Sequence, residues 1–241
     1  MSLPRLIVPF PGLPAENLLV PLEANQARHL DVLRLKPGSA LELLLPTGPW
    51  RADLAELRKD KAMARLVAPL EERREPPIGL QACLPLTAQL GLWDDWLPGT
   101  VELGATLIQP IIFARSEFEA RKIAPKLERW RRIVGTACEQ SHRNCIPELR
   151  DPLPFESLLA WDAPQKWVAY ELTTGERNPT LQNQTLAFTH GPEGGITDHE
   201  FRALREANWR SVTLGASILR AVTCPAALLG AVQFELGRGF Q

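Results

Sequence analysis

The chain has 241 residues, of which 45% are hydrophobic and 23% charged, and its formal net charge is −1. This composition is that of an ordinary globular protein, and no apolar run approaches the ~18 residues that a membrane span requires. The start Met-Ser-Leu-Pro-Arg lacks the basic and then apolar build of a signal peptide, so we expect a cytoplasmic protein with no membrane partner. The four cysteines form no Cys-x-x-Cys pair, so we expect no metal site.

The net charge is close to zero, but one segment of the chain is basic. From Arg115 to Arg150 the chain has nine Lys or Arg and five Asp or Glu, whereas Pro76 to Ala114 contains no Lys or Arg. A basic segment in a neutral protein forms a solvated helix face or contacts a polyanion such as RNA. Charge alone favours the solvated face.

Residues 1–70 predict a small β-barrel. Several short strands and one helix in so few residues are typical of that architecture. The expected strands are apolar runs at 6–10, 18–22, 41–45, 50–57 and 62–70, and the expected helix covers 23–35. Residues 71–77 are charged, end in two prolines and predict a linker.

Beyond the linker, strand and helix patterns alternate over residues 78–241. Such alternation predicts a mainly parallel sheet covered by helices. The expected strands are 78–86, 106–113, 146–149 and 167–172; the expected helices are 93–103, broken near Pro98-Gly99, then 126–143 and 155–161.

The stretch from Leu186 to Glu200 has the strongest local signals. An apolar strand over 186–188 leads into Gly191-Pro-Glu-Gly-Gly195, and Thr197 with Glu200 has the spacing of a capping box that begins a helix. The pattern recurs at strand 212–214, a loop opened by Gly215, and helix 226–236 with Pro225 in its first turn. Two loops at the carboxyl ends of strands predict one ligand crevice.

The residues of these loops leave several roles open. Gly191–Gly195 matches neither a dinucleotide fingerprint nor a P-loop, so it is an ordinary turn or a rigid backbone that a ligand approaches closely. Arg220 in its apolar loop would pair with a carboxylate or hold RNA, and His190 could act as a base. The polar run from Glu139 to Asn144 is either solvated or contacts phosphates and base edges.

Several motifs, taken in their order along the chain, resemble the RsmE family of bacterial RNA methyltransferases. The resemblance spans nearly the whole chain. It implies methylation of N3 of a uridine in 16S ribosomal RNA, with S-adenosylmethionine as the methyl donor. The alternatives are a related enzyme that acts on transfer RNA and an RNA-binding homologue that is catalytically weak. The motifs are His29-Leu-Asp-Val-Leu-Arg34, Glu102-Leu-Gly104, Ile108-x-Pro110 with Arg115-Ser116, Ala137-Cys-Glu-Gln-Ser141 with Arg143 and Ile146-Pro-Glu148, Gly191–Gly195, and Leu214-Gly215 with Ile218-Leu-Arg220.

The resemblance also implies the fold and the assembly. Residues 1–70 would form an N-terminal PUA-like RNA-binding β-barrel, and residues 78–241 a C-terminal SPOUT α/β domain with a deep trefoil knot. The family implies a homodimer whose partner is 16S ribosomal RNA or the small ribosomal subunit.

The resemblance also implies functional residues at the positions that match the family's motifs. The cofactor would be held by Tyr170, Glu171, His190, Gly191, Pro192, Glu193, Gly194, Gly195, Leu214, Gly215, Ile218, Leu219 and Arg220. Catalysis would use Arg143, Arg220 or Arg115 to favour the uridine anion electrostatically, with His190 as a candidate base. Contacts to RNA are expected from Arg28, Arg34, Arg129, Arg132, Gln140 and Arg143.

Three features depart from the family pattern. The second loop has Ser217 where the family has arginine, and Ala221 and Val222 where it has polar residues. A stretch that is usually rich in lysine is the uncharged Leu86-Thr-Ala-Gln-Leu90, and His190 replaces an aliphatic residue. The missing lysines reduce the positive charge that would face RNA.

Overall fold

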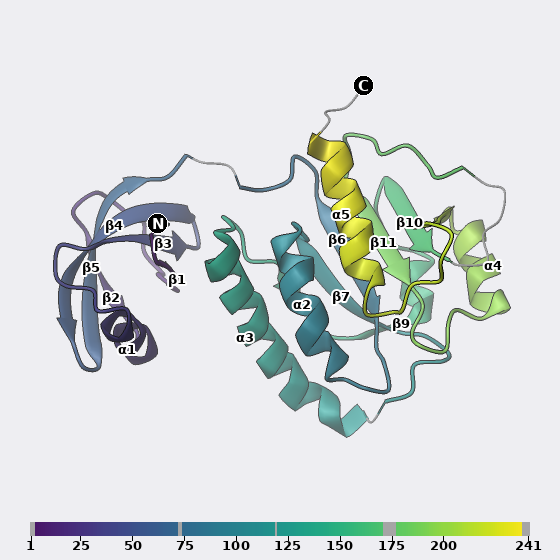
Figure 1. The fold of residues 1–241 in the computed structure, drawn as a ribbon, viewed down its shortest axis with the longest axis horizontal. Coiled ribbons are helices and arrows are strands. Elements are labelled where there is room, and N and C mark those ends of the chain that lie inside the picture. Colours follow the sequence, from purple (N-terminus) through teal and green to yellow (C-terminus); the bar gives the residue numbers. More distant parts are fainter. Residues whose placement is uncertain (1–2, 72–73, 119, 171–176, 238–241) are drawn as a thin grey trace. The chain divides into compact units, whose positions relative to one another are not determined.

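A computed structural model describes residues 3–71, 74–118, 120–170 and 177–237 of the chain (Figure 1). The chain divides into two compact units. The first comprises Met1–Glu75 together with Cys138–Cys145, and the second comprises Pro76–Ala137 and Ile146–Gln241. The division expected from the sequence assigned residues 138–145 to the second part, whereas the contacts group them with the first.

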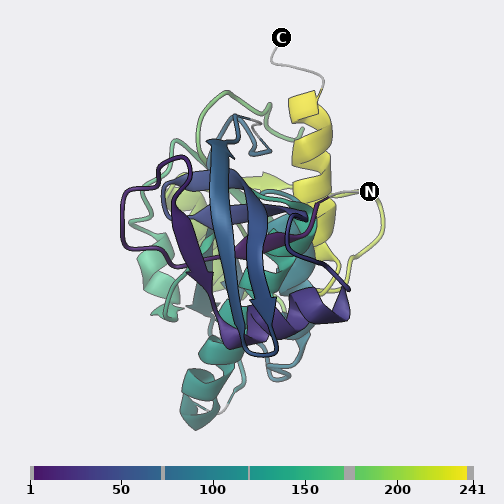
Figure 2. The same cartoon turned by 90° about the vertical axis from the view of Figure 1, so that its left-hand side faces the viewer.

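The first unit is a curled five-stranded sheet with one helix, and Figure 2 faces this unit. The strand order is β1-β3-β4-β5-β2, in which β1 runs parallel to β3 and the other neighbours are antiparallel. The elements expected over residues 1–70 are therefore present, with ends that differ by a few residues. They are β1 (Arg5–Ile7), β2 (Leu19–Leu22), α1 (Ala24–Val32), β3 (Ala40–Leu45), β4 (Gly48–Arg58) and β5 (Lys61–Pro69).

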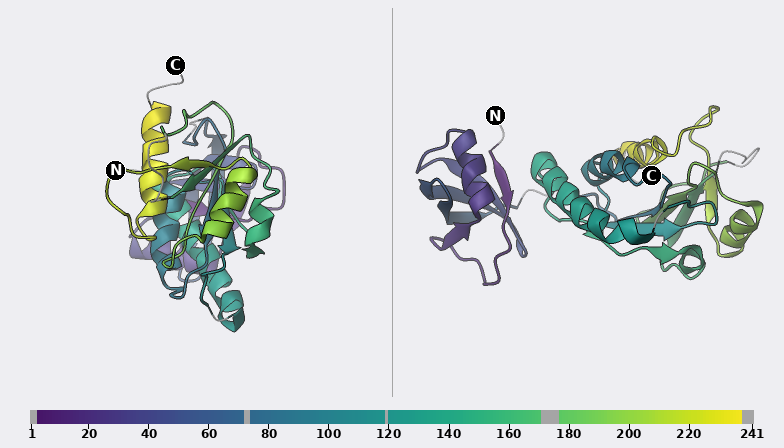
Figure 3. Two further views of the ribbon diagram at one scale, coloured as in Figure 1. Left: turned by 90° about the vertical axis from the view of Figure 1, so that its right-hand side faces the viewer. Right: turned by 90° about the horizontal axis from the view of Figure 1, so that it is seen from below.

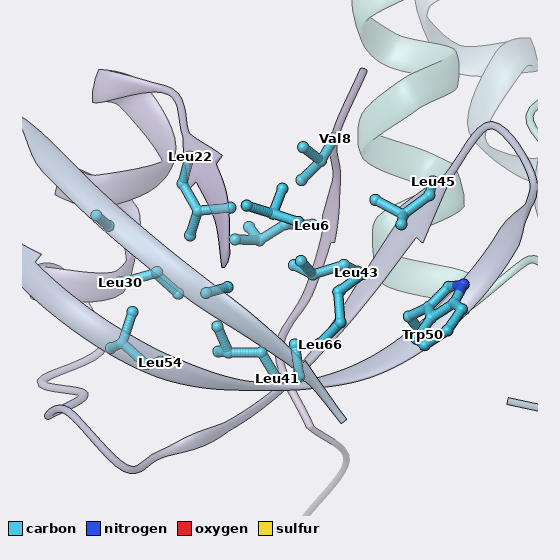
Figure 4. Packing of buried hydrophobic residues seen from close by; sticks show 14 of the residues in the cluster. Leu6, Val8, Leu22, Leu30, Leu41, Leu43, Leu45, Trp50, Leu54 and Leu66 are labelled. Carbon is cyan, nitrogen blue, oxygen red and sulfur yellow. The ribbon is translucent and has the colours of Figure 1, made fainter. Parts of the chain in front are cut away.

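The curl of this sheet encloses an apolar core (Figure 4). Along β4, Trp50, Ala52 and Leu54 are buried at alternate positions, as expected for a strand with one face on a core. Leu30 of α1 and Leu66 of β5 join the same cluster and are fully buried. The alternation along the strands explains why short apolar runs sufficed to find this unit.

The second unit is a parallel sheet of seven strands. Its main path is β12-β10-β11-β6-β7-β8, and β9 pairs with β7. All of these pairs are parallel. The strands are β6 (Leu80–Pro85), β7 (Leu107–Ile112), β8 (Glu148–Leu149), β9 (Leu153–Pro154), β10 (Gln165–Ala169), β11 (Leu186–His190) and β12 (Arg210–Val212).

Helices cover both faces of this sheet, as Figure 3 shows. On one face the His190 ring of β11 meets Trp96 of α2, and on the other Leu204 of α4 clusters with Val168 and Ala187. The alternation along β11 explains this, because residues 187 and 190 point to opposite faces. The helical elements are α2 (Leu92–Glu102), η1 (Ala120–Lys122), α3 (Ile123–Ser141), η2 (Phe155–Leu158), α4 (Asp198–Glu206) and α5 (Cys224–Gly237).

Several expected boundaries were wrong. Helix α2 is continuous through Pro98, because its buried Trp93, Trp96 and Val101 hold it against the unit and proline removes only one helical hydrogen bond. Helix α3 begins at Ile123, since a proline at position 125 fits the first turn. The expected helix at 155–161 is only the short η2.

The strands of the second unit also differ in their ends. Strand β11 continues to His190 because it pairs with β10 as far as Ala169. Strand β12 ends at Val212, so Leu214 belongs to the following loop. Within the described part of the chain, every helix is too short or too polar to cross a bilayer.

Candidate functional site

A cavity of about 850 Å³ lies in the second unit where β10, β11 and β12 end. These strands are neighbours, so the loops at their carboxyl ends meet at one edge of the sheet. The expected crevice between the two loops is therefore present. The lining residues are Gln89, Leu92, Arg115, Ala169, Tyr170, His190 to Ile196, Asp198, Val212 to Val222 and Cys224.

The first wall is the glycine loop, residues Gly191–Gly195. Its turn is closed by a hydrogen bond from Gly195 N to Pro192 O at 2.8 Å, and Gly195 has φ +76°. A Cβ on Gly191 would lie 2.9 Å from Ile196 N and 3.0 Å from Gly195 C, so the backbone folds too tightly for any side chain there. The loop therefore presents main-chain groups to the cavity.

Arg115 bonds to the glycine loop, and Glu200 fixes the start of the helix that follows it. The Glu200 carboxylate closes the expected capping box of α4 with Thr197 and also accepts a hydrogen bond from Ala114 N at 2.7 Å. Arg115, in the segment that follows β7, donates from Nη1 to Gly194 O at 2.6 Å, and its stem packs on that glycine. The buried Glu200 thus joins two segments that are 86 positions apart.

The second wall is the loop from Thr213 to Thr223, hereafter the second loop. Its start is held by Asn178, whose side chain donates to Thr213 O and accepts from Thr213 N, both at 2.8 Å. Further along, the loop is open, and the Ile218 side chain is 77% exposed although it lines the cavity. Gly215 has φ +118°, a conformation that suits glycine.

Aromatic contacts support the floor of the cavity. Tyr170, just beyond β10, stacks on Phe201 of α4 with ring centroids 3.8 Å apart. His190 meets Trp96 of α2 edge-on at 5.5 Å. The cavity floor is thus built from packed residues of both sheet faces.

His190 is buried and neutral at physiological pH. Desolvation lowers the pKa of its imidazole to about 4, against which a hydrogen bond between Nδ1 and Gly191 O acts weakly. Because that carbonyl accepts from Nδ1–H, Nε2 carries no proton, and it has no hydrogen-bond partner among the described residues. A group with so low a pKa is a weak base for a uridine proton.

The structure separates the three candidate arginines. Arg115 and Arg220 both line the cavity. Arg143 does not: its side chain is only 2% exposed and pairs with Glu75 in the first unit. The Arg143 carbonyl accepts from Arg5, and Glu75 also accepts from Asn144 N. Arg143 therefore joins the end of α3 to Glu75 within the first unit.

The other residues expected to contact RNA are exposed. Arg28 pairs with Asp60, Arg129 with Asp94, and Arg132 donates to the Glu128 carbonyl. Arg34 and Gln140 are exposed as well. Of the cofactor residues expected from sequence, those from the two loops and Tyr170 line the cavity, while Glu171 lies outside the described residues.

Sequence reasoning missed several lining residues. Gln89 precedes α2, Leu92 is the first residue of α2, and Asp198 is the first residue of α4. Only Asp198 had a local signal, because it follows the capping residue Thr197. Across the described residues, no cluster of His, Cys, Asp or Glu has the composition of a metal site.

Comparisons with known proteins agree with this architecture. Residues 76–233 match the model of the RNA methyltransferase domain. The chain is 34% identical over 223 residues to Ribosomal RNA small subunit methyltransferase E of Synechocystis, covering 88% of this chain and 72% of that protein. It is 31% identical to the Bacillus subtilis protein of the same name, covering 91% of this chain and 92% of that one.

A solved structure gives the same result over almost the full length. Ribosomal RNA small subunit methyltransferase E from Neisseria gonorrhoeae, bound to S-adenosylmethionine, superposes with a TM-score of 0.85 and 31% identity, covering 97% of this chain and 98% of that one. With the family model matching more than half of the chain, these likenesses show that the protein belongs to the RsmE family of RNA methyltransferases.

Proposed function

We propose that this protein transfers a methyl group from S-adenosylmethionine to N3 of a uridine in the 16S ribosomal RNA of the small subunit. The observation that carries the proposal is the cavity between the glycine loop and the second loop, in a chain of this family. The Neisseria gonorrhoeae relative is bound to the same cofactor.

The residues of the cavity fit this cofactor. A volume of about 850 Å³ is within the range of small-molecule sites. Gly191 leaves main-chain groups accessible to the polar edge of an adenine, and Leu214, Ile218 and Leu219 provide apolar cover for its faces. The carboxylates of Glu193 and Asp198 suit a ligand that carries positive charges.

When bound, S-adenosylmethionine supplies an electrophilic methyl group on a sulfonium sulfur. A uridine attacks through N3 after its N3 proton has left to water, so the charge to be stabilised is that of the uridine anion. Arg115 and Arg220, which line the cavity, are proposed to favour this anion electrostatically. Holding the two reactants in line can lower the activation barrier by ~7–11 kcal/mol in favourable cases.

Arg143 and His190 receive other roles in this proposal. Arg143 is committed to Glu75, so it anchors the end of α3. His190, with a pKa of about 4, serves as a neutral wall residue. No general base is assigned: the proton leaves to water, and the two arginines stabilise the uridine anion that remains.

The finer architecture is part of the same proposal. We assign the curled sheet of residues 1–70 as a PUA-like barrel that contacts RNA through Arg28 and Arg34, residues 71–77 as a linker, and residues 78–241 as a SPOUT domain with a trefoil knot. Supporting the knot, the chain leaves β12 at one edge of the sheet and returns to α5, which packs on α2.

We also propose a homodimer. Helix α5 (CPAALLGAVQFELG) contains one charged residue in 14, so apolar residues occur on all of its sides. Phe234 on this helix is 66% exposed. An apolar helix at a surface is typical of a contact between protein chains.

The test is methylation in vitro. Small ribosomal subunits and stripped 16S rRNA, both from a strain lacking the enzyme, are incubated with the purified protein and S-adenosylmethionine. The RNA is then digested to nucleosides for mass spectrometry. We expect 3-methyluridine in one of the two substrates. Methylation of transfer RNA alone would favour the related tRNA enzyme. Binding of RNA with no cofactor heat in titration calorimetry would favour a protein without turnover.

A further inference from the structure

A second cavity of about 500 Å³ lies in the same unit. The segment before α2 forms one of its sides through Ala88, Leu90 and Gly91. The other lining residues are Glu117 and Phe118, which follow β7, Lys122 of η1 and Lys126 of α3. Among the described residues, none lines both cavities.

The two cavities nevertheless share a wall. Gln89 and Leu92 line the cofactor cavity, whereas Ala88, Leu90 and Gly91 line the second. The five consecutive residues 88–92 thus each line one cavity or the other. The segment 88–92 therefore separates a ligand in the second cavity from the cavity proposed for the cofactor.

The second cavity combines an aromatic side chain with positive charge. Phe118 is half-buried, so one part of its ring is accessible. The segment from Arg115 to Arg132 has seven Lys or Arg and three Glu, a balance of +4. Asp94 is shared by Lys126 at 3.8 Å and Arg129 at 2.9 Å, so one carboxylate faces two cations. Of the lining residues that the structure describes, Glu117 carries the opposing charge.

We propose that this cavity binds the nucleotide next to the target uridine, with its base on Phe118 and its phosphate at Lys122 and Lys126. The inference rests on the proposed function. An aromatic ring beside cations is the combination that binds single-stranded RNA, because bases stack and phosphates pair with lysine. The target base itself needs N3 at the cofactor cavity, so only a neighbouring nucleotide fits here.

In this proposal, the positive charge that contacts RNA comes from residues of the second cavity. The stretch Leu86–Leu90 carries no charge. Lys122 and Lys126 supply charge from the opposite side of the same cavity. The second cavity thus receives from η1 and α3 the charge that the segment before α2 lacks.

The first experiment varies the ring in steady-state methylation of ribosomal RNA. We expect Phe118→Ala and Phe118→Leu to raise KM for RNA by about tenfold, the range of a lost base stack. Phe118→Trp should restore the wild-type KM. Affinity for S-adenosylmethionine, measured by calorimetry, should be unchanged because Phe118 does not line the cofactor cavity. A Phe118→Leu variant with wild-type KM would overturn the proposal, since leucine fills space but does not stack.

The second experiment varies the charge. Lys122→Ala and Lys126→Ala should each reduce the slope of log affinity for RNA against log salt by about 0.7, the value for one phosphate contact on a single strand. The matched control is Arg210→Ala, because Arg210 is exposed at the amino end of β12 and lines neither cavity. Equal slopes for the lysine variants and the control would overturn the proposal.

The proposed function and the proposed second site are contradicted by different results. Absence of methylation by the wild-type protein would contradict the proposed function. A wild-type protein that methylates RNA, with Phe118 and lysine variants that match it, would contradict only the second site.

Discussion

The two walls of the cofactor cavity are built in opposite ways. The glycine loop is bonded by Arg115 and is followed by a helix start that Glu200 joins to Ala114, and the backbone around Gly191 leaves no room for a Cβ. The second loop is held at its start by Asn178 and then exposes Ile218 to solvent. One wall is preformed, and the other has apolar surface that a ligand would cover.

This difference assigns different tasks to the walls. A preformed main-chain wall gives orientation, because its groups lose little freedom when a ligand binds. An exposed apolar wall gives affinity through the surface it buries. Changes in the glycine loop should therefore affect the site as a whole, and changes in the second loop should affect binding alone.

The largest loss of affinity for S-adenosylmethionine is expected for Gly191→Ala. The added Cβ would lie 2.9 Å from Ile196 N, so the backbone must shift. Overpacking of this kind costs about 1–3 kcal/mol, and we expect affinity for S-adenosylmethionine to fall about a hundredfold. Titration calorimetry measures this. Gly99→Ala is the control, because nothing lies within 4 Å of its Cβ. Equal loss in both variants would contradict a preformed wall.

The next effect concerns pH and His190 at the base of the glycine loop. The unfolded chain binds a proton at this position below pH 6.5, whereas burial lowers the folded pKa to about 4. The stability that this residue contributes is therefore present above pH 6.5 and is lost as pH falls toward 4.

Replacing His190 with leucine should remove that dependence. Between pH 7 and pH 4 the free energy of unfolding of the wild type should fall by about 3 kcal/mol more than that of His190→Leu. Urea denaturation at several pH values measures the difference. A constant gap between the two proteins would show that the imidazole is solvated.

A smaller effect is expected for Glu200→Ala. This substitution removes the cap of α4 and leaves Ala114 N without its acceptor. We expect the free energy of unfolding to fall by about 2 kcal/mol. Glu206→Ala, at an exposed position of the same helix, is the control and should change stability by less than about 0.5 kcal/mol. Similar losses would mean that Glu200 does not connect the two segments.

The smallest effect is expected for Ile218→Ser in the second loop. Affinity for S-adenosylmethionine should fall about tenfold, because the apolar cover is lost. Thermal stability should be unchanged, since the side chain is 77% exposed without ligand. A large drop in stability would contradict the distinction between the walls.

The cavity between the two loops was largely predictable because its sequence signals are local. A strand, a Gly-Pro-Glu-Gly-Gly turn and a capping box lie within 15 residues, from Leu186 to Glu200. The two strands that precede the loops are short and apolar, so the crevice at their carboxyl ends followed from the general rule for parallel sheets.

Long-range pairing was not predictable. Arg143 was predicted to contact RNA, and no local pattern indicated the ion pair that it forms with Glu75, 68 positions away. The second cavity joins residues 88–91 with residues 117–126, and no periodicity links those segments. Helix α2 was expected to break at Pro98, because proline disrupts helices. The burial of Trp93 and Trp96, which holds the helix together, cannot be read from the local sequence.

The most direct test of the two-wall account is a crystal structure of this protein with S-adenosylmethionine. The account expects the cofactor between the two loops, with main-chain contacts to Gly191–Gly195 and with Ile218 buried against it. A cofactor bound outside that cavity, or one that leaves Ile218 exposed, would contradict it.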